Sequence, residues 1–145
     1  MQTIQTQALD LMQSWSDSDP TQAGKFDFPI HIGTGAMSSS LVYFEVQPGQ
    51  HCGMHTHSAE EIAYIVAGSA EVVVGEERAS ASEGDLTLIP AMAPHDVYNV
   101  GSTALKVIGF FSSAAVLTTF DGILSPLGTS IIVIGAPHEE PALAQ

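Results

Sequence analysis

The sequence predicts an all-β protein, built as an antiparallel sandwich or barrel. Short runs rich in β-branched and aromatic residues recur between residues 40 and 134, and glycine, proline and serine separate them. No helical pattern lies between these runs, which argues against alternating helices and parallel strands. The 145 residues are 45% hydrophobic, enough for the core of one domain.

The N-terminal region contains the one helix that we expect. Apolar residues recur there at helical spacing, at Ile4, Ala8, Leu11, Met12 and Trp15. The cluster Ser-Asp-Ser-Asp-Pro at residues 16–20 ends this short helix. A loop through Gly24 and Pro29 then leads to the first strand.

The predicted strands follow one another at short intervals. They cover residues 40–46, 62–66, 71–74, 85–89, 97–100 and 104–111, with 116–120 and 131–134 as two further candidates. After Gly135 the segment rich in proline and glutamate predicts a frayed tail.

Composition and charge exclude several classes of partner. Three Lys+Arg against 16 Asp+Glu give a net charge of -13, which argues against binding nucleic acid or an anionic membrane. Charged residues are only 13% of the chain, too few to cover a monomer well, so we expect a homodimer. The single cysteine, Cys52, suits a reducing compartment. With no membrane-length apolar segment and no signal-peptide pattern, we expect a cytoplasmic protein.

Histidines and a glutamate form the most informative pattern. His55 and His57 stand at i and i+2 of an extended segment, so their side chains point the same way. Glu61 follows a Ser-Ala turn, and a returning strand can bring its carboxylate beside them. Two imidazoles and one carboxylate suit divalent iron, manganese, nickel or zinc. His95 opens a later strand, after a turn rich in proline, and hairpin stacking can place it opposite this pair.

These residues resemble the two sequence motifs of the cupin family. The first motif is matched by Gly49, His55, His57, Glu61 and Gly68, and the second by Gly84, Pro90, His95 and Asn99. Met92 stands where the family usually has glycine. The resemblance covers residues 37–111.

The resemblance implies a jelly-roll β-barrel with a metal held by His55, His57, Glu61 and His95. We therefore expect an N-terminal helical arm at 1–24, a cupin barrel at 25–135 and a flexible tail at 136–145. Glycine at the position of Met92 permits a positive φ angle. The turn here is accordingly expected to differ in shape, or the methionine side chain to reach the mouth of the pocket.

The surroundings of the metal leave some questions open. His51 acts as an acid or base at the pocket mouth in one interpretation, and is an exposed loop histidine in the other. If Glu61 faces inward, Ala63 and Ile65 do too, and Val97 and Asn99 follow His95. The inward residues of strand 40–46 are not decided by the sequence. Cys52 is expected to be a small buried apolar residue.

The expected function is that of a metal-dependent cupin enzyme acting on a small, fairly apolar organic substrate. Lys25, Arg78 and Lys106 all lie outside the two motifs, which argues against anionic substrates. We expect foremost a non-haem iron dioxygenase, with Glu61 and His51 as catalytic residues and Fe2+ ahead of Mn2+, Ni2+ or Zn2+. The alternatives are a redox-neutral isomerase, lyase or cyclase with the same site, and a cupin that binds a small ligand without turnover.

Overall fold

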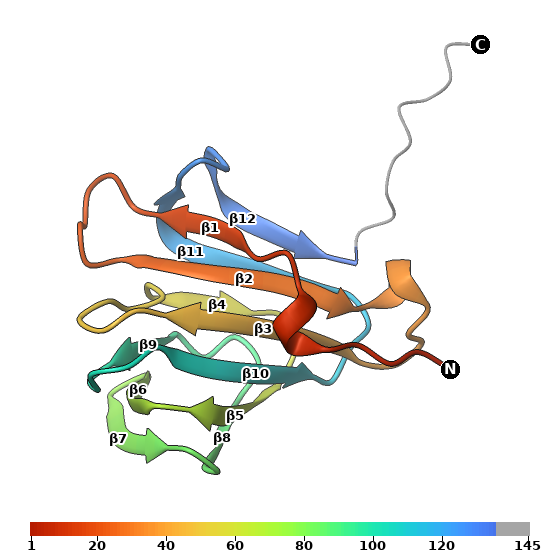
Figure 1. The fold of residues 1–145 in the computed structure, drawn as a ribbon. Coiled ribbons are helices and arrows are strands. Elements are labelled where there is room, and N and C mark those ends of the chain that lie inside the picture. The colour runs from red at the N-terminus through yellow and green to blue at the C-terminus, as the bar shows by residue number, and fades with distance from the viewer. Residues whose placement is uncertain (136–145) are drawn as a thin grey trace.

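Two antiparallel sheets of six strands each face one another in the computed structural model, which describes residues 1–135 (Figure 1). In spatial order the first sheet contains β1 (Met12–Trp15), β2 (Ala23–Ile30), β3 (Ser40–Val46), β10 (Leu105–Phe111), β5 (Glu61–Ala67) and β8 (Leu86–Ile89). The second contains β12 (Thr129–Ile134), β11 (Val116–Leu124), β4 (His55–His57), β9 (His95–Asn99), β6 (Ser69–Val74) and β7 (Glu77–Ser82). The predicted all-β, antiparallel architecture is confirmed, and the tail expected at 136–145 lies outside the described residues.

The predicted N-terminal helix is wrong. Only one 3-10 turn, η1 (Thr6–Ala8), forms, and residues 12–15 are the strand β1 instead. The pairing of β1 with β2 joins Met12 to Phe26 and Trp15 to Ala23, and Trp15 also exchanges backbone hydrogen bonds with Ser125. A helix this short is marginal in water, so strand pairing with distant residues overrides the helical spacing.

Two strands lack the pattern that predicted the others. β2 occupies the segment that we expected to be a loop, because its Pro29 and Gly24 suggested one. β7 reads Glu-Arg-Ala-Ser-Ala-Ser and has one buried residue, Ala81. β7 is held by pairing with β6 rather than by apolar side chains of its own, whereas β2 pairs with β3 and also packs Phe26 and Phe28 against the core.

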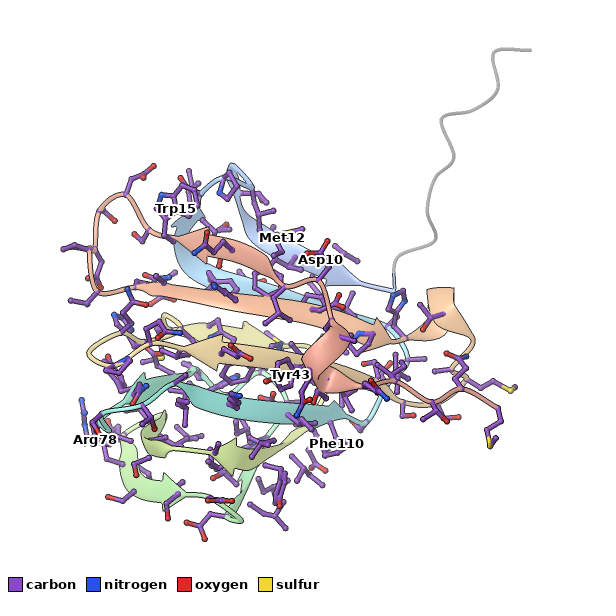
Figure 2. The ribbon with its side chains drawn as sticks, in the orientation of Figure 1. Asp10, Met12, Trp15, Tyr43, Arg78 and Phe110 are labelled. Carbon is purple, nitrogen blue, oxygen red and sulfur yellow. The ribbon has the colours of Figure 1, made fainter. Side chains whose placement is uncertain are left out.

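The two faces of β3 answer the question left open for residues 40–46. Val46 is fully buried in the core between the sheets, and Phe44 packs against the same core. Tyr43 points to the outer face and donates a hydrogen bond to Glu45 at 2.7 Å. It is nevertheless only 3% exposed, and Figure 2 shows it beside the N-terminal turn. The N-terminal segment therefore covers this part of the outer face.

One half of the space between the sheets is a closed apolar core. Its buried residues are Val46, Ala63, Ile65, Ala70, Val72, Ala81, Ile89, Val97, Leu105 and Val107. Ala63 and Ile65 face inward as predicted, and Glu61 continues the same inward row of β5. The core thus fixes the strands that carry the polar residues described next. No helix within residues 1–135 has the length and apolar character needed to cross a membrane.

Candidate metal centre

Three histidines of the second sheet converge in the other half of the interior. His55 of β4 and His95 of β9 are direct cross-strand partners, and His57 follows His55 on the same face of β4. A ring nitrogen of each lies within 4.8 Å of one in each of the other two. All three side chains are buried. His95 therefore lies beside the first pair in one sheet, rather than opposite it.

Hydrogen bonds fix the orientation of two of the rings. Nδ1 of His55 donates to the backbone oxygen of Gly53 at 2.6 Å, and Nδ1 of His95 donates to that of Ala93 at 2.9 Å. Because a carbonyl oxygen only accepts, Nδ1 must carry the proton in both rings. In the neutral ring Nε2 is then an unprotonated nitrogen with a free lone pair, the form that binds a metal.

Thr118 of β11 holds the third ring. Its Oγ1 lies 2.7 Å from Nδ1 of His57, and Thr118 and His57 are cross-strand partners. Sequence reasoning missed Thr118. The available signal was its position between Val116 and Phe120 on the inward face of a predicted strand, where a polar residue needs a partner.

Glu61 approaches the histidines from the first sheet. Its Oε1 lies 3.4 Å from Nε2 of His95 and 3.7 Å from Nε2 of His57, and the residue is 3% exposed. Its carboxylate does not complete a four-ligand cluster with all three rings, since the group of mutually close ligand atoms contains the histidines alone. The carboxylate faces them across the interior, and β5 is not hydrogen-bonded to β4.

One buried atom shows that the site suits a cation. Nε2 of His95 is buried and has no hydrogen-bond partner among residues 1–135. Nε2 lies 3.4 Å from Glu61 Oε1, and in the neutral ring with the proton on Nδ1 neither of these two atoms has a hydrogen to donate. Such a buried arrangement is unfavourable unless a positive charge lies near both atoms. A divalent metal ion supplies that charge.

Burial keeps two of the imidazoles neutral. Burial first, and then the neighbouring histidines, lower the pKa of His55 to about 3 and that of His57 to about 2. These two rings are therefore neutral nitrogen donors at pH 7. Together with the carboxylate of Glu61 they form the donor set typical of divalent iron, manganese, nickel or zinc sites.

A cavity of about 80 Å³ opens on the histidines and Glu61. Its wall is mainly aromatic and aliphatic, with Phe26, Phe28, Val42, Phe44, Phe120 and Ile132. Cys52 also lines it, and burial raises the pKa of this thiol well above its ordinary value. Lys25, which lies outside both motifs, borders the cavity as well. Strand alternation gives the inward positions of β2 to Gly24, Phe26 and Phe28, and pairs Lys25 with Glu45.

His51 does not line this cavity. Its side chain is 11% exposed, so it is not an exposed loop histidine. Nδ1 lies 2.7 Å from Asp96 Oδ2, and Nε2 lies 2.9 Å from Asp19 Oδ2. Its ring also stacks on Tyr98. Both ring nitrogens are thus engaged by carboxylates, and neither points to the histidine cluster.

Met92 keeps the turn shape that glycine usually provides. Its φ angle is 65°, in the left-handed region, and its backbone N–H donates to the oxygen of His57 at 2.8 Å. The side chain is 61% exposed and is absent from the cavity wall. The expectation of a reshaped turn or an obstructed pocket mouth is therefore wrong. The hydrogen bond to His57 holds the backbone in place.

Comparison with known proteins supports the same assignment of the fold. Residues 42–111 match the sequence profile of the cupin domain. An uncharacterized protein of Methanocaldococcus jannaschii is 32% identical over 73 residues, which are 50% of this chain and 58% of that protein. The chain thus spans little more than half the length of this relative.

Solved structures of cupins superpose on the chain. Oxalate decarboxylase of Lactobacillus farciminis has a TM-score of 0.64 and 27% identity, over 68% of this chain and 31% of that one. The polyketide cyclase RemF of Streptomyces resistomycificus has a TM-score of 0.62 and 19% identity, over 77% of this chain and 78% of that one. Because sequence and structure agree, residues 42–111 of the chain are a cupin domain.

Proposed function

We propose that this protein is a metal-dependent cupin enzyme in which His55, His57, His95 and Glu61 hold a divalent metal ion. Nε2 of His95, buried without a hydrogen-bond partner and 3.4 Å from Glu61 Oε1, carries the proposal. A bound divalent cation would interact favourably with both of these atoms.

The reaction that we propose is oxygenation by non-haem iron. Bound Fe2+ supplies a Lewis acid and an electron source for dioxygen chemistry, and Mn2+, Ni2+ or Zn2+ suit the same ligands. The protein's own residues set the conditions. His55 and His57 are neutral, Glu61 is the carboxylate nearest to the histidines, and the wall around them is mainly aromatic and aliphatic.

The shape and chemistry of the cavity favour a small, neutral and fairly apolar substrate. Phe26, Phe28 and Phe120 offer aromatic faces to a flat molecule, and the small volume limits its size. The cation at the cavity wall, Lys25, is the cross-strand partner of Glu45, which borders the cavity too, so the wall offers no positive charge without a neighbouring carboxylate. A substrate with one oxygen for the metal and an apolar body fits this arrangement.

A second candidate is a redox-neutral reaction at the same site. The similarity to an oxalate decarboxylase, at 27% identity, favours metal-dependent chemistry in which the substrate undergoes no net oxidation. In that case Glu61 accepts or donates the proton that the substrate exchanges, because it is the acidic side chain in the cavity wall nearest the histidines. An isomerase, lyase or cyclase would use these same groups.

The experiment combines metal analysis with oxygen consumption. The purified chain is analysed for bound metals, then loaded with Fe2+, Mn2+ or Zn2+ and assayed with a panel of diketones and phenols in an oxygen electrode. Substrate-dependent oxygen uptake with iron supports the oxygenase. Turnover that continues without oxygen replaces it with the redox-neutral candidate, and tight binding without turnover makes the protein a ligand-binding cupin. Absence of any stoichiometric metal overturns the proposal.

A further inference from the structure

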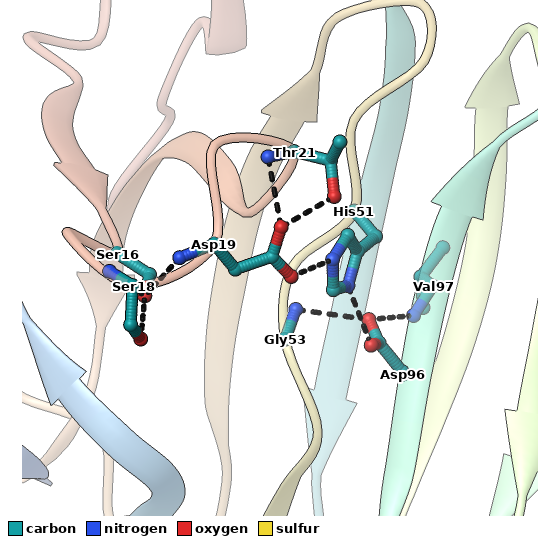
Figure 3. A network of polar contacts seen from close by, with 8 residues as sticks. All are labelled: Ser16, Ser18, Asp19, Thr21, His51, Gly53, Asp96 and Val97. Carbon is teal, nitrogen blue, oxygen red and sulfur yellow. Dashed lines mark hydrogen bonds and ion pairs between the residues drawn. The ribbon is translucent and has the colours of Figure 1, made fainter.

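A buried carboxylate next to the metal centre is held by three donors. Asp96 directly follows His95 in β9 and is 1% exposed. Its Oδ1 accepts hydrogen bonds from the backbone N–H of Gly53 at 2.9 Å and of Val97 at 2.7 Å. Its Oδ2 lies 2.7 Å from Nδ1 of His51 (Figure 3). Asp96 therefore joins β9 to the segment that leads into β4.

His51 extends this network to the loop between β1 and β2. Its Nε2 lies 2.9 Å from Asp19 Oδ2, while Asp19 Oδ1 accepts from the N–H and hydroxyl of Thr21 (Figure 3). The backbone of His51 also bonds to Thr21 and Ala23. The loop that precedes β2, a wall of the cavity, is thereby fastened to the residue that contacts Asp96.

Gly53 connects the network to a proposed metal ligand. Its N–H is held by Asp96, and its carbonyl oxygen accepts the hydrogen bond from Nδ1 of His55 at 2.6 Å. Its φ angle of 102° lies in the region that favours glycine, and it turns the two adjoining peptide groups to these two partners. A Cβ at this position would overlap the side chain of Gln22, so the space around Gly53 is filled.

The network contains charged side chains that are buried or half-buried. Replacing a buried ion pair by apolar residues is often neutral or stabilising, so such a pair is weak support for a purely structural role. Here the carboxylate of Asp96 accepts a hydrogen bond from the N–H of Gly53, and the carbonyl oxygen of Gly53 holds the imidazole of His55 in the metal centre. The arrangement resembles the outer hydrogen bonds that orient metal-binding histidines in proteins.

We infer that Asp96, His51 and Asp19 are positioning residues for the metal centre. They fix Gly53, and through its carbonyl group they fix the ring orientation and the Nδ1–H tautomer of His55. This inference rests on the proposed function for its role, but the tautomer of His55 is a property of the metal-free chain. His51 accordingly acts through Asp96 and Gly53, and is not the acid or base at the pocket mouth that the sequence suggested.

The test compares two variants of the network with two controls. Asp96→Asn removes the charge and keeps the size, and Asp19→Asn alters the outer end, where the side chain is 39% exposed and folding is not at risk. Asp17→Asn is the loop control, because Asp17 contacts Trp15 and Ser125 instead. Leu105→Ala removes a fully buried core side chain away from the network, and controls for loss of stability.

Two measurements are made on each full-length variant. Nitrogen-15 NMR of the metal-free chain reports the tautomer of the histidine rings, and competition with a chelator gives the dissociation constant for Zn2+. We expect Asp96→Asn to mix the tautomers of His55 and to weaken Zn2+ binding by roughly 10- to 100-fold. Asp19→Asn shifts both in the same direction by a smaller factor, and the two controls leave the tautomer unchanged.

Each outcome decides between the two proposals. If the native chain binds no metal but Asp96→Asn still mixes the tautomers, the metal-dependent function fails and the positioning role stands. If the native chain binds Zn2+ and Asp96→Asn keeps both the tautomer and the affinity, the positioning role is overturned. Leu105→Ala matching Asp96→Asn in both measurements also overturns it, because general loss of stability then explains the effect.

Discussion

Gly109 of β10 borders the Glu61 carboxylate so closely that a side chain at position 109 would overlap it. The two residues lie on neighbouring strands, where Gly109 pairs with Ala63 and Glu61 with Phe111. The absence of a Cβ in β10 thus makes the space that the carboxylate occupies. A glycine within a strand often marks such a close approach.

We expect Gly109→Ala to displace Glu61 and weaken the metal centre. Overpacking costs about 1–3 kcal/mol of unfolding free energy, and loss of a metal-site contact weakens Zn2+ binding by roughly 10- to 100-fold. Denaturant unfolding and chelator competition measure the two effects. Gly122→Ala is the matched control, since a Cβ there has nothing within 4 Å. Equal Zn2+ affinity in both variants would contradict the assigned role of Glu61.

Thr118 gives a second prediction about the same centre. Thr118→Val keeps the shape of the side chain but removes the hydroxyl that lies 2.7 Å from His57 Nδ1. We expect Zn2+ affinity to fall by roughly 10- to 100-fold, and Thr118→Ser to restore most of it. Thr119→Val is the control, because Thr119 is exposed on the opposite face of β11. An unchanged affinity in Thr118→Val would show that His57 does not need this partner.

The sequence predicted most of the strands and the residues at the centre, because both depend on local patterns. Strand alternation alone placed Glu61, Ala63 and Ile65 on one face, and the structure has them there. β3 matches its predicted range at both ends, since its run of β-branched and aromatic residues is uninterrupted. The resemblance to the cupin motifs implied that His55, His57 and His95 lie together, and the structure has them within 4.8 Å of one another.

What the sequence could not predict depends on contacts between distant segments. β1 is a strand because β2 and Ser125 pair with it, and no local pattern in residues 12–15 reports those partners. The role of Asp96 likewise depends on residues that are distant in the sequence. Its partners His51 and Gly53 lie more than forty positions earlier, and only the β9 register brings them within hydrogen-bonding distance. Met92 shows the reverse case, where a local rule failed because a hydrogen bond to His57 holds the turn.

An exposed row of apolar residues on the first sheet leads to a prediction of oligomeric state. Phe110, Ile62 and Leu88 are cross-strand neighbours on β10, β5 and β8, and are 46%, 42% and 60% exposed. Figure 2 shows Phe110 on the same outer face as Tyr43, which the N-terminal segment covers. We expect the chain to form a homodimer through this row, because large exposed apolar patches mark interfaces.

Analytical ultracentrifugation at micromolar concentration checks this expectation. Leu88→Glu places a charge in the centre of the row and should yield a monomer. Leu117→Glu is the control, because Leu117 is similarly exposed, at 45%, on β11 of the other sheet. A monomeric native chain, or dissociation by Leu117→Glu alone, would remove this row as the interface.

His51 makes part of the stability depend on pH. Burial disfavours its charged form, but hydrogen bonds and charges from Asp96 and Asp19 outweigh burial and raise its pKa above the ordinary value of 6.5. Asp19 stays ionised, because hydrogen bonds from Thr21, together with His51, lower its pKa to about 2. Tyr98, stacked on the ring, has its pKa raised, first by burial, and remains neutral.

The direction of the pH effect follows from the raised pKa. The folded chain holds the His51 proton more tightly than the unfolded chain, so this contribution is complete below pH 6.5 and is lost as the pH rises through the folded-state pKa. Against His51→Phe, which keeps the ring but not the nitrogens, the native chain should be more stable by about 1.5–3 kcal/mol at pH 6. The difference should shrink at alkaline pH. Urea unfolding of both metal-free chains between pH 6 and 9.5 measures it, and a difference that grows with pH would mean that His51 is neutral between its two carboxylates.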